Sequence, residues 1–374
     1  MKKFSLYYIT YQTFPASTAN SLQTIKNIKY LLRNNIEVSL FFPLRESYSN
    51  SSIDSINEFY NIDLNFEITG LKHNYPFGKT KYLEKILFHA SHFLWAKKNV
   101  KYILKNFQES DYYMTRSDWV FFFLILQRKK VVFECHQTSR LRTIILFFLK
   151  NKANAKIVFL NPYLYEKYGK NLKRRNCIIL QNGVDLDGVD SKLNYKKKQI
   201  IFAGNIERFK SSRGIDLLIN AFLKSKINAE YKLIIIGGPH SAVKKLKEEY
   251  INSETLNKLE ILGYLNHKKT LKIMAESQIG VLINTSNNLH SKFYTSPLKY
   301  FEYLAFKLKI IAVDLPSHRV LNYNEEIKYF NEGDEDQLIS ILNNIDKLKV
   351  NNITNLNEIT LDYRIKELIK FIDN

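Results

Sequence analysis

Several features that would narrow the class of this protein are missing from its sequence. Only two cysteines occur, Cys135 and Cys177, and they lie far apart with no metal-ligand spacing, which favours free thiols in a reducing compartment. The longest uninterrupted apolar runs are Val120–Leu126 and Ile144–Leu149, well short of the roughly 20 residues that span a bilayer. The start of the chain soon turns polar and resembles a first strand rather than a signal peptide. We therefore expect a cytoplasmic protein.

Proline and glycine are also scarce, at 7 and 12 of 374 residues. The sequence contains neither the G-x-G-x-x-G fingerprint of dinucleotide-binding enzymes nor a Walker loop. By contrast, 45% of the residues are apolar and 14% are aromatic, which excludes global disorder. A chain of this length accommodates two α/β domains of roughly 180 residues each.

Acidic residues are few in the first half of the chain. Residues 1–180 carry 28 Lys and Arg against 12 Asp and Glu, a difference of +16; the totals of 56 and 36 leave 28 against 24 for residues 181–374, or +4. The abundance of Asn, Ile and Lys, as an AT-rich coding sequence would give, explains the net charge but not this placement. The basic half predicts contact with something anionic: a membrane surface, an acidic glycan or a nucleic acid.

Strand-like and helix-like segments alternate along almost the whole chain, which is typical of parallel sheets covered by helices. Residues 43–80 have weak periodicity and predict an irregular excursion with at most one short strand pair. The predicted fold class is α/β, with two Rossmann-like doubly wound domains facing a cleft, where such folds bind ligands. The expected strands are Phe4–Ile9, Glu37–Phe42, Asp111–Thr115, Lys130–Glu134, Lys156–Leu160 and Cys177–Leu180, then Gln199–Ala203, Lys232–Ile236, Leu259–Leu262, Gly280–Ile283 and Lys309–Ala312.

A charged, turn-rich segment, 182–198, separates the two series of strands. We therefore expect one domain over residues 1–181 and a second over 182–356. A last helical pattern within 357–374 follows a polar, Asn-rich stretch and could pack on either domain.

One segment of the second domain suits the binding of a diphosphate. An apolar strand ends in a polar loop, after which Ser296 is a natural N-cap and Pro297 suits the first helical position. The helix start offers backbone N–H groups to an anion, Lys299 adds charge, and Glu302 could accept from the vicinal hydroxyls of a ribose. An ordinary capped helix with a surface Lys and Glu is the plain alternative.

A second segment, Phe202–Gly214, gathers cations. Its strand ends at Gly204, and Arg208, Lys210 and Arg213 follow before a helix. Three cations in one loop suit a phosphate clamp, because arginine binds phosphate through two parallel hydrogen bonds. A solvated basic loop is the alternative.

The order and spacing of these segments resemble the GT-B glycosyltransferases, specifically the retaining, family 4-like group whose C-terminal half is called the group 1 domain. The resemblance covers essentially the whole chain and is strongest over 181–316. It rests on Gln-Asn-Gly-Val-Asp at 181–185, Phe-Ala-Gly at 202–204 with Arg213-Gly214, Leu-Ile-Ile-Ile-Gly-Gly at 233–238, Leu-Gly-Tyr-Leu at 262–265, Ser-Pro-Leu-Lys at 296–299 and Glu-Tyr-Leu-Ala at 302–305.

The resemblance implies a role for each matching position in the donor site. Arg213, with Arg208 or Lys210, would hold the donor diphosphate, and Glu302 would accept from the ribose. Further donor-binding candidates are Gly204 and Asn205, the turn Gly263, Tyr264 and Leu265 against the base, and Tyr294 with the helix start Ser296, Pro297, Leu298 and Lys299.

In the first domain, the resemblance places a histidine, His136, near the reacting sugar. The catalytic candidates are therefore His136, Arg213 and Glu302. The loop Pro15–Asn20, with Ala16 and Asn20, would close over the donor phosphate and the acceptor.

Two positions depart from the family pattern. The family often has a pair of glutamates, and the first of the pair falls on Tyr294 here, while Asn205 stands where many members have an arginine. Asp185 and Asp187 spell the metal-binding D-x-D of a different glycosyltransferase fold but continue an interdomain turn. We expect no metal and no cofactor, since the nucleotide-sugar is a substrate.

The expected partners are a nucleotide-sugar donor, a glycan or lipid-linked acceptor, and an anionic membrane surface, where the protein would attach peripherally to the inner face of the cytoplasmic membrane. Aromatic runs interleaved with cations over Asp118–Ile157, and Lys97, Lys98, Lys101 and Lys105 on one helical pattern, favour that surface, with buried helices and solvated ends as the alternative. No nucleic-acid module is present. A nucleotide-sugar epimerase and a non-catalytic partner subunit remain the alternative functions.

Overall fold

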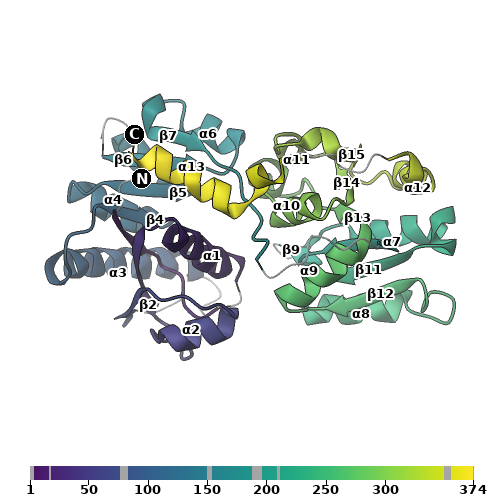
Figure 1. Cartoon of the computed structure of the whole chain (residues 1–374), viewed down its shortest axis with the longest axis horizontal. Helices are drawn as coiled ribbons and strands as arrows, with labels where there is room; N and C mark the ends of the chain where they lie inside the picture. The colour runs from purple at the N-terminus through teal and green to yellow at the C-terminus, as the bar shows by residue number, and fades with distance from the viewer. Residues whose placement is uncertain are drawn as a thin grey trace. The chain divides into compact units, whose positions relative to one another are not determined.

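The computed structural model describes residues 4–16, 18–75, 83–149, 154–187, 196–208, 211–348 and 355–373. The chain divides into two units (Figure 1). The first consists of residues 1–180 with 365–374, and the second consists of residues 181–364. The division falls inside the last helix, α13 (Leu361–Asp373), which is yellow in Figure 1.

The first unit is built on a parallel sheet of seven strands in the order β3-β2-β1-β4-β5-β6-β7. A central strand such as β5, whose five residues are all buried, is covered on both faces, which explains why all of them except Glu134 are apolar. The strands are β1 (Ser5–Ile9), β2 (Glu37–Leu44), β3 (Glu67–Lys72), β4 (Tyr112–Thr115), β5 (Val131–Cys135), β6 (Ala155–Phe159) and β7 (Cys177–Ile179).

Six helices of this unit connect the strands. In several of them the residue before the helix is an N-cap, because its side chain accepts from the backbone N–H three residues later. Thr18 caps α1, Ser52 caps α2 and Ser117 caps α4 in this way. The helices are α1 (Ala19–Arg33), α2 (Ile53–Tyr60), α3 (Glu84–Asn106), α4 (Asp118–Leu126), α5 (Arg140–Leu149) and α6 (Pro162–Tyr168), with a 3₁₀ turn η1 (Arg174–Asn176) before β7.

The prediction of an irregular excursion over 43–80 does not hold for residues 53–60 and 67–72. Residues 53–60 form α2 and residues 67–72 form the edge strand β3, which pairs with β2 in parallel. An edge strand contacts the core on little of its length, and only Leu71 of β3 is buried. The apolar period that identifies a strand is therefore absent from this part of the sequence.

The second unit has a parallel sheet of six strands in the order β12-β11-β8-β13-β14-β15. A separate antiparallel pair, β9 (Glu207–Arg208) with β10 (Ser211–Ser212), follows β8. The strands of the main sheet are β8 (Lys197–Ala203), β11 (Lys232–Ile236), β12 (Leu259–Gly263), β13 (Ser277–Leu282), β14 (Lys309–Val313) and β15 (Ile327–Phe330).

Alternate side chains of β8 enter two different cores, because successive residues of a strand point to opposite faces. Ile200 and Phe202 pack in the cluster that contains α7, α8 and α12, whereas Ile201 and Ala203 pack in the cluster that contains α9 and α10. The helices are α7 (Ile215–Lys224), α8 (His240–Tyr250), α9 (His267–Glu276), α10 (Leu298–Ala305), α11 (Pro316–Arg319) and α12 (Glu335–Asn343), with the short turns η2 (Lys226–Ala229), η3 (His290–Tyr294), η4 (Asn324–Glu326), η5 (Ile345–Lys347) and η6 (Leu356–Ile359).

Close packing of α10 on β13 depends on a glycine. A Cβ at Gly280 would lie 2.5 Å from Cδ2 of Tyr303, so no larger residue fits without a shift of the helix. The Tyr303 hydroxyl lies below the end of β8. It accepts from the Ala203 N–H (3.3 Å) and lies 3.4 Å from the Ile201 carbonyl. This packing carries the first turns of α10 to the carboxyl edge of the sheet.

Both sheets have the strand order 3-2-1-4-5-6 of a doubly wound fold, extended by one strand in the first unit. The prediction of two Rossmann-like sheets is therefore confirmed. In such a sheet, ligands bind outside the carboxyl ends of the strands where the winding direction reverses. That point lies between β1 and β4 in the first unit and between β8 and β13 in the second. No helix among the described residues is long and apolar enough to cross a membrane.

Candidate donor and catalytic sites

Three loops at the carboxyl edge of the second sheet are joined by backbone hydrogen bonds. The Gly204 N–H donates to Ile236 (2.9 Å), the Ile206 N–H to Gly238 (2.7 Å) and the Gly237 N–H to Gly263 (2.8 Å). Gly237 has a φ of +146°, and a Cβ there would lie 1.7 Å from the Gly204 carbonyl oxygen. Only glycine permits this approach, so the ends of β8, β11 and β12 form one rigid edge.

Arg213 lies at this edge, directly before α7. Its N–H donates to the Ile206 carbonyl (3.1 Å), its Nη1 donates to the Asn205 carbonyl (3.2 Å), and its guanidinium lies over the Phe202 ring. The Tyr264 hydroxyl donates to Asn205 Oδ1 (3.1 Å), although 66% of the Tyr264 residue is exposed. The fold thus brings together Gly204, Asn205, Arg213 and the Gly263–Leu265 turn, which are distant in sequence.

The start of α10 differs in detail from the prediction. Ser296 does not cap the helix: Pro297 occupies the N-cap position, and no side chain accepts from the first turn. Ser296 instead contacts Asn182, whose N–H donates to Ser296 Oγ (3.2 Å) and whose Nδ2 donates to the Ser296 carbonyl (2.6 Å). The serine was predicted as a cap from local sequence, whereas a residue 114 positions away uses its hydroxyl.

Glu302 is a buried carboxylate in the second turn of α10, and only 5% of the residue is exposed. Lys299 Nζ donates to its Oε2 (2.7 Å) and His267 Nε2 lies 3.0 Å from its Oε1. Burial raises the pKa of Glu302, but Lys299 and then His267 outweigh it and lower the pKa to about 2. The carboxylate is therefore ionised at any physiological pH and can only accept hydrogen bonds.

Arg213 and Glu302 both shift the pKa of the same buried phenol, that of Tyr303. Burial raises the pKa of Tyr303, the Ala203 N–H lowers it, Glu302 raises it and Arg213 lowers it. The charge of Arg213 also lowers the pKa of His318. Burial is the larger cause, and the pKa of that histidine falls to about 4. Arg213 follows β8 and Glu302 lies on the helix after β13, so the two strands at which the winding reverses lead to a cation and to a carboxylate.

In the first unit, His136 directly follows β5 and lies beside a buried ion pair. Arg116 Nε donates to Glu134 Oε2 (2.7 Å), and both side chains are at least nine-tenths buried. The Tyr8 hydroxyl donates to the same carboxylate oxygen (3.4 Å), and His136 Nε2 lies 3.6 Å from it. These residues come from the ends of β1, β4 and β5, so His136 lies at the carboxyl edge of its sheet.

The predicted loop Pro15–Asn20 is shorter in the structure. Thr18 caps α1, so Asn20 lies inside the helix, where its carbonyl accepts from Thr24 Oγ1 (3.0 Å). Ala16 is held by Tyr60 of α2, whose hydroxyl accepts from the Ala16 N–H (2.9 Å) and donates to the Ala16 carbonyl (2.8 Å). Asn20 was placed in the loop because the family resemblance assigns the segment after the first strand to a loop.

Some predicted residues add little to this geometry. Lys210 lies outside the described residues, and Arg208 is placed only as part of β9. Tyr294 is the last residue of the turn η3, Leu298 is the first of α10 and Leu265 packs against the core beneath α9 and α10. In the described part of the chain, no group of three His, Cys, Asp or Glu residues could hold a metal ion.

Sequence reasoning missed two groups of residues beside the predicted ones. His267 is 35 positions from Glu302, and Arg116 is 18 positions from Glu134. Asn266 before His267 was recognisable as a helix cap, but nothing local indicates which carboxylate the histidine meets.

Comparisons with known proteins identify a family for part of the chain and a fold for all of it. Residues 197–345 match the family model described as "Glycosyl transferases group 1". No curated protein matches the chain. Among solved structures, a glycosyltransferase from Rickettsia africae is 14% identical with a TM-score of 0.68, over 100% of this chain and 98% of that one.

Two further solved structures have the same fold. The lipopolysaccharide outer core galactosyltransferase WaaB is 12% identical with a TM-score of 0.62 over 99% of both chains. WaaG, a glycosyltransferase involved in lipopolysaccharide biosynthesis, is 11% identical with a TM-score of 0.57, over 98% of this chain and 95% of that one. Residues 197–345 are therefore similar to the group 1 glycosyltransferases, and the chain has the GT-B fold.

Proposed function

We propose that this protein transfers a sugar from a UDP- or GDP-sugar to a glycan or lipid-linked acceptor, with retention at the anomeric carbon and without a metal ion. The observation that carries the proposal is the buried, ionised Glu302 carboxylate in the second turn of α10, with Arg213 in the loop after β8 of the same sheet. A carboxylate beside a helix start suits a ribose, and an arginine suits a diphosphate.

In the proposed reaction, the bond between the anomeric carbon and the diphosphate oxygen breaks, and its electron pair leaves with the diphosphate. The acceptor hydroxyl forms the new bond to the anomeric carbon and loses its proton. Arg213 and the N–H groups at the start of α10 would stabilise the charge that develops on the departing diphosphate. His136 would orient the donor sugar or the acceptor hydroxyl.

We further propose that the acceptor belongs to bacterial surface polysaccharide or glycolipid synthesis and is met at the inner face of the cytoplasmic membrane. Two of the similar structures are named for lipopolysaccharide synthesis, and the +16 charge of residues 1–180 suits an anionic surface. Neither observation identifies the acceptor itself.

The test is a thermal-shift panel of UDP- and GDP-sugars on the full chain, repeated for Glu302→Ala and Arg213→Ala. We expect one donor to raise the Tm of the wild type and to raise the Tm of each variant much less. The same titration in excess EDTA should be unchanged. Restoration of a lost shift by a divalent ion would make the metal-free mechanism wrong and direct attention to Asp185 and Asp187.

The alternatives give different outcomes in the same panel. A non-catalytic partner subunit, which the Tyr294 position suggests, would bind no donor or would bind one without turnover. An epimerase would convert the donor sugar with no acceptor present. Product analysis after incubation with the bound donor therefore separates the three functions.

A further inference from the structure

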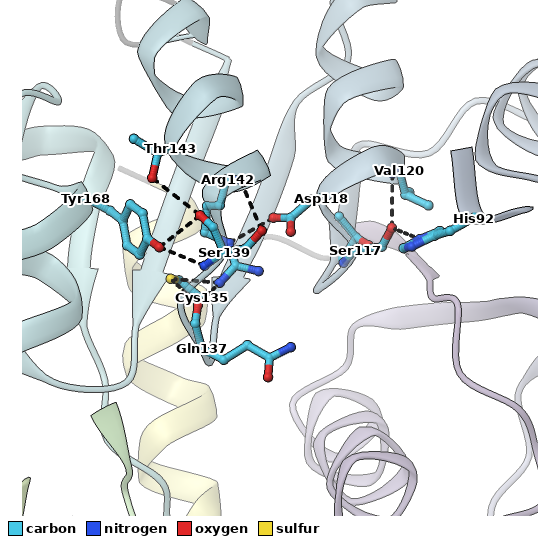
Figure 2. Close-up of polar contacts among 11 residues, drawn as sticks. His92, Ser117, Asp118, Val120, Cys135, Gln137, Ser139, Arg142, Thr143 and Tyr168 are labelled. Carbon is cyan, nitrogen blue, oxygen red and sulfur yellow. Dashed lines mark hydrogen bonds and ion pairs between the residues drawn. The ribbon is translucent and has the colours of Figure 1, made fainter. Parts of the chain in front are cut away.

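The N-terminus of α4 holds the helices on both sides of it (Figure 2). Ser117 Oγ accepts from the Val120 N–H (3.1 Å) and lies 2.6 Å from His92 Nε2 of α3. On the other side, Asp118 Oδ1 accepts from Arg142 Nε of α5 (2.8 Å). The three helices are therefore one layer with α4 in the middle.

These contacts also fix the rotation of α3 and α5 about their own axes. Arg142 is 3% exposed and donates as well to the Gln137 carbonyl, while Tyr168 and Thr143 donate to the Ser139 carbonyl just before α5 (Figure 2). Turning α5 would leave a buried guanidinium without its carboxylate, which is strongly unfavourable. The face of α5 opposite Arg142 is consequently held outward.

That outward face of α5 is apolar. Ile144 is 55% exposed, Phe147 63% and Phe148 70%, whereas Ile145 and Leu146 on the inner side are buried. Exposing two phenylalanines and an isoleucine together on one helix is unusual for a protein surrounded only by water.

The outward face of α3 continues this apolar surface and adds cations. Ile86 is 66% exposed and Leu94 44%, and the exposed lysines Lys97, Lys98 and Lys101 follow at helical spacing. Within the described residues these lysines form no ion pair. Among the described residues of 1–180, ten large apolar side chains are exposed, and eight of them belong to α3, α4 or α5 or directly precede α3.

We propose that the outward face of α3, α4 and α5 binds an anionic lipid bilayer. The aromatic rings of α5 would enter the interface between headgroups and acyl chains, and the lysines of α3 would lie over anionic headgroups. A nucleic acid would use the lysines but not the exposed aliphatic side chains, and the core of a protein interface is poor in lysine. The inference rests on the proposed membrane-linked acceptor and names the surface that would meet it.

The experiment measures binding of the full chain to vesicles of about 60% phosphatidylcholine and 40% phosphatidylglycerol, at low and high salt. Lys97→Gln, Lys98→Gln and Lys101→Gln combined should weaken binding about 100-fold, since each cation contributes a factor of about five. Phe147→Ser with Phe148→Ser should weaken it by about tenfold for each ring.

Matched controls come from the second unit. Lys244, Lys245 and Lys247 are exposed on α8, and Leu256 is 61% exposed, so their replacement by Gln and by Ser removes the same kinds of group elsewhere. These variants should bind like the wild type. Equal losses in the α3 and α8 variants, or equal binding to purely phosphatidylcholine vesicles, would make the inference wrong.

The donor thermal shift is measured in parallel on every variant. Unchanged vesicle binding in the α3 and α5 variants, with the donor shift intact, would overturn only the docking surface. Vesicle binding that depends on these residues, without any donor shift, would retain the surface and remove the proposed transfer.

Discussion

Each unit buries a carboxylate at the carboxyl edge of its sheet, but the two carboxylates are held differently. Glu134 pairs with Arg116, and the two side chains are 1% and 7% exposed. Glu302 pairs with Lys299 and His267, which are 26% and 32% exposed. The same strand order therefore supports one ion pair that is closed to water and one carboxylate whose partners reach solvent.

The difference teaches which carboxylate can receive a ligand. A ligand can replace one partner of Glu302 at the carboxylate. The displaced side chain is partly exposed and is then solvated, so it loses little free energy. Arg116 has no such freedom, because separating a buried pair leaves a charge without solvent. We therefore infer that Glu134 positions its neighbours, His136 among them, while Glu302 remains the candidate for contact with the donor.

The largest expected difference between the two carboxylate sites is in the free energy of unfolding. Arg116→Ala should lower the free energy of unfolding by about 3–5 kcal/mol, because it leaves the Glu134 carboxylate buried without its cation. Lys299→Ala should cost less, about 1–3 kcal/mol, since His267 still lies against the buried Glu302 carboxylate. Urea unfolding of both variants measures this. Combining Arg116→Met with Glu134→Gln should recover part of the loss, and equal losses for Arg116→Ala and Lys299→Ala would contradict the distinction.

The next largest effect is expected on the rate of sugar transfer. Glu302→Ala should lower kcat/KM by two to three decades, the equivalent of about 2–4 kcal/mol for a charged hydrogen bond in a closed site. Its unfolding free energy should change far less than that of Arg116→Ala. The measurement is steady-state kinetics with the donor found by thermal shift. Near-normal turnover in Glu302→Ala would remove Glu302 from the donor site.

A third prediction uses the buried histidine of each unit. Burial lowers the pKa of His318 to about 4 and that of His92 well below its ordinary 6.5. A folded-state pKa below the unfolded one means that stability is complete above pH 6.5 and falls as the pH decreases toward 4, by on the order of 3 kcal/mol for His318. Glu302 contributes only near the lower end of this window, since its loss of stability begins around the unfolded-state carboxyl pKa of about 4.3 and is complete only below its folded pKa of about 2.

The check is unfolding at several pH values for the wild type, His318→Asn and His92→Asn. Each variant should flatten part of the acid slope, and the double variant should flatten most of it. An unchanged slope in the double variant would show that other groups cause the acid sensitivity.

The smallest effect is expected for His267. Replacing it with Asn should raise the pKa of Glu302 slightly and lower kcat/KM by about three- to tenfold, because the Asn amide can still donate to the carboxylate and only part of the about 1.5–3 kcal/mol of a charged hydrogen bond is lost. Steady-state kinetics of His267→Asn with the same donor measure this. A loss as large as that of Glu302→Ala would mean that His267 itself contacts the substrate.

The sequence by itself determined the class of fold and most of the strands. Buried parallel strands such as β11 and β14 are short apolar runs, and this local property survives in any tertiary context. The order of the motifs over 181–316 was enough to predict the group 1 domain that the family match bears out. The roles of His136, Arg213 and Glu302 stay predictions.

Only the tertiary structure decided the pairings around those residues. Ser296 was expected to cap its own helix and instead contacts Asn182, Asn20 lies inside α1, and the partners of Glu302 and Glu134 come from other elements. Edge strands β3 and β15 were missed because they bury few side chains. The physical reason is the same in each case: a hydrogen bond or ion pair forms between groups that folding brings together, and sequence periodicity records only which face of an element is buried.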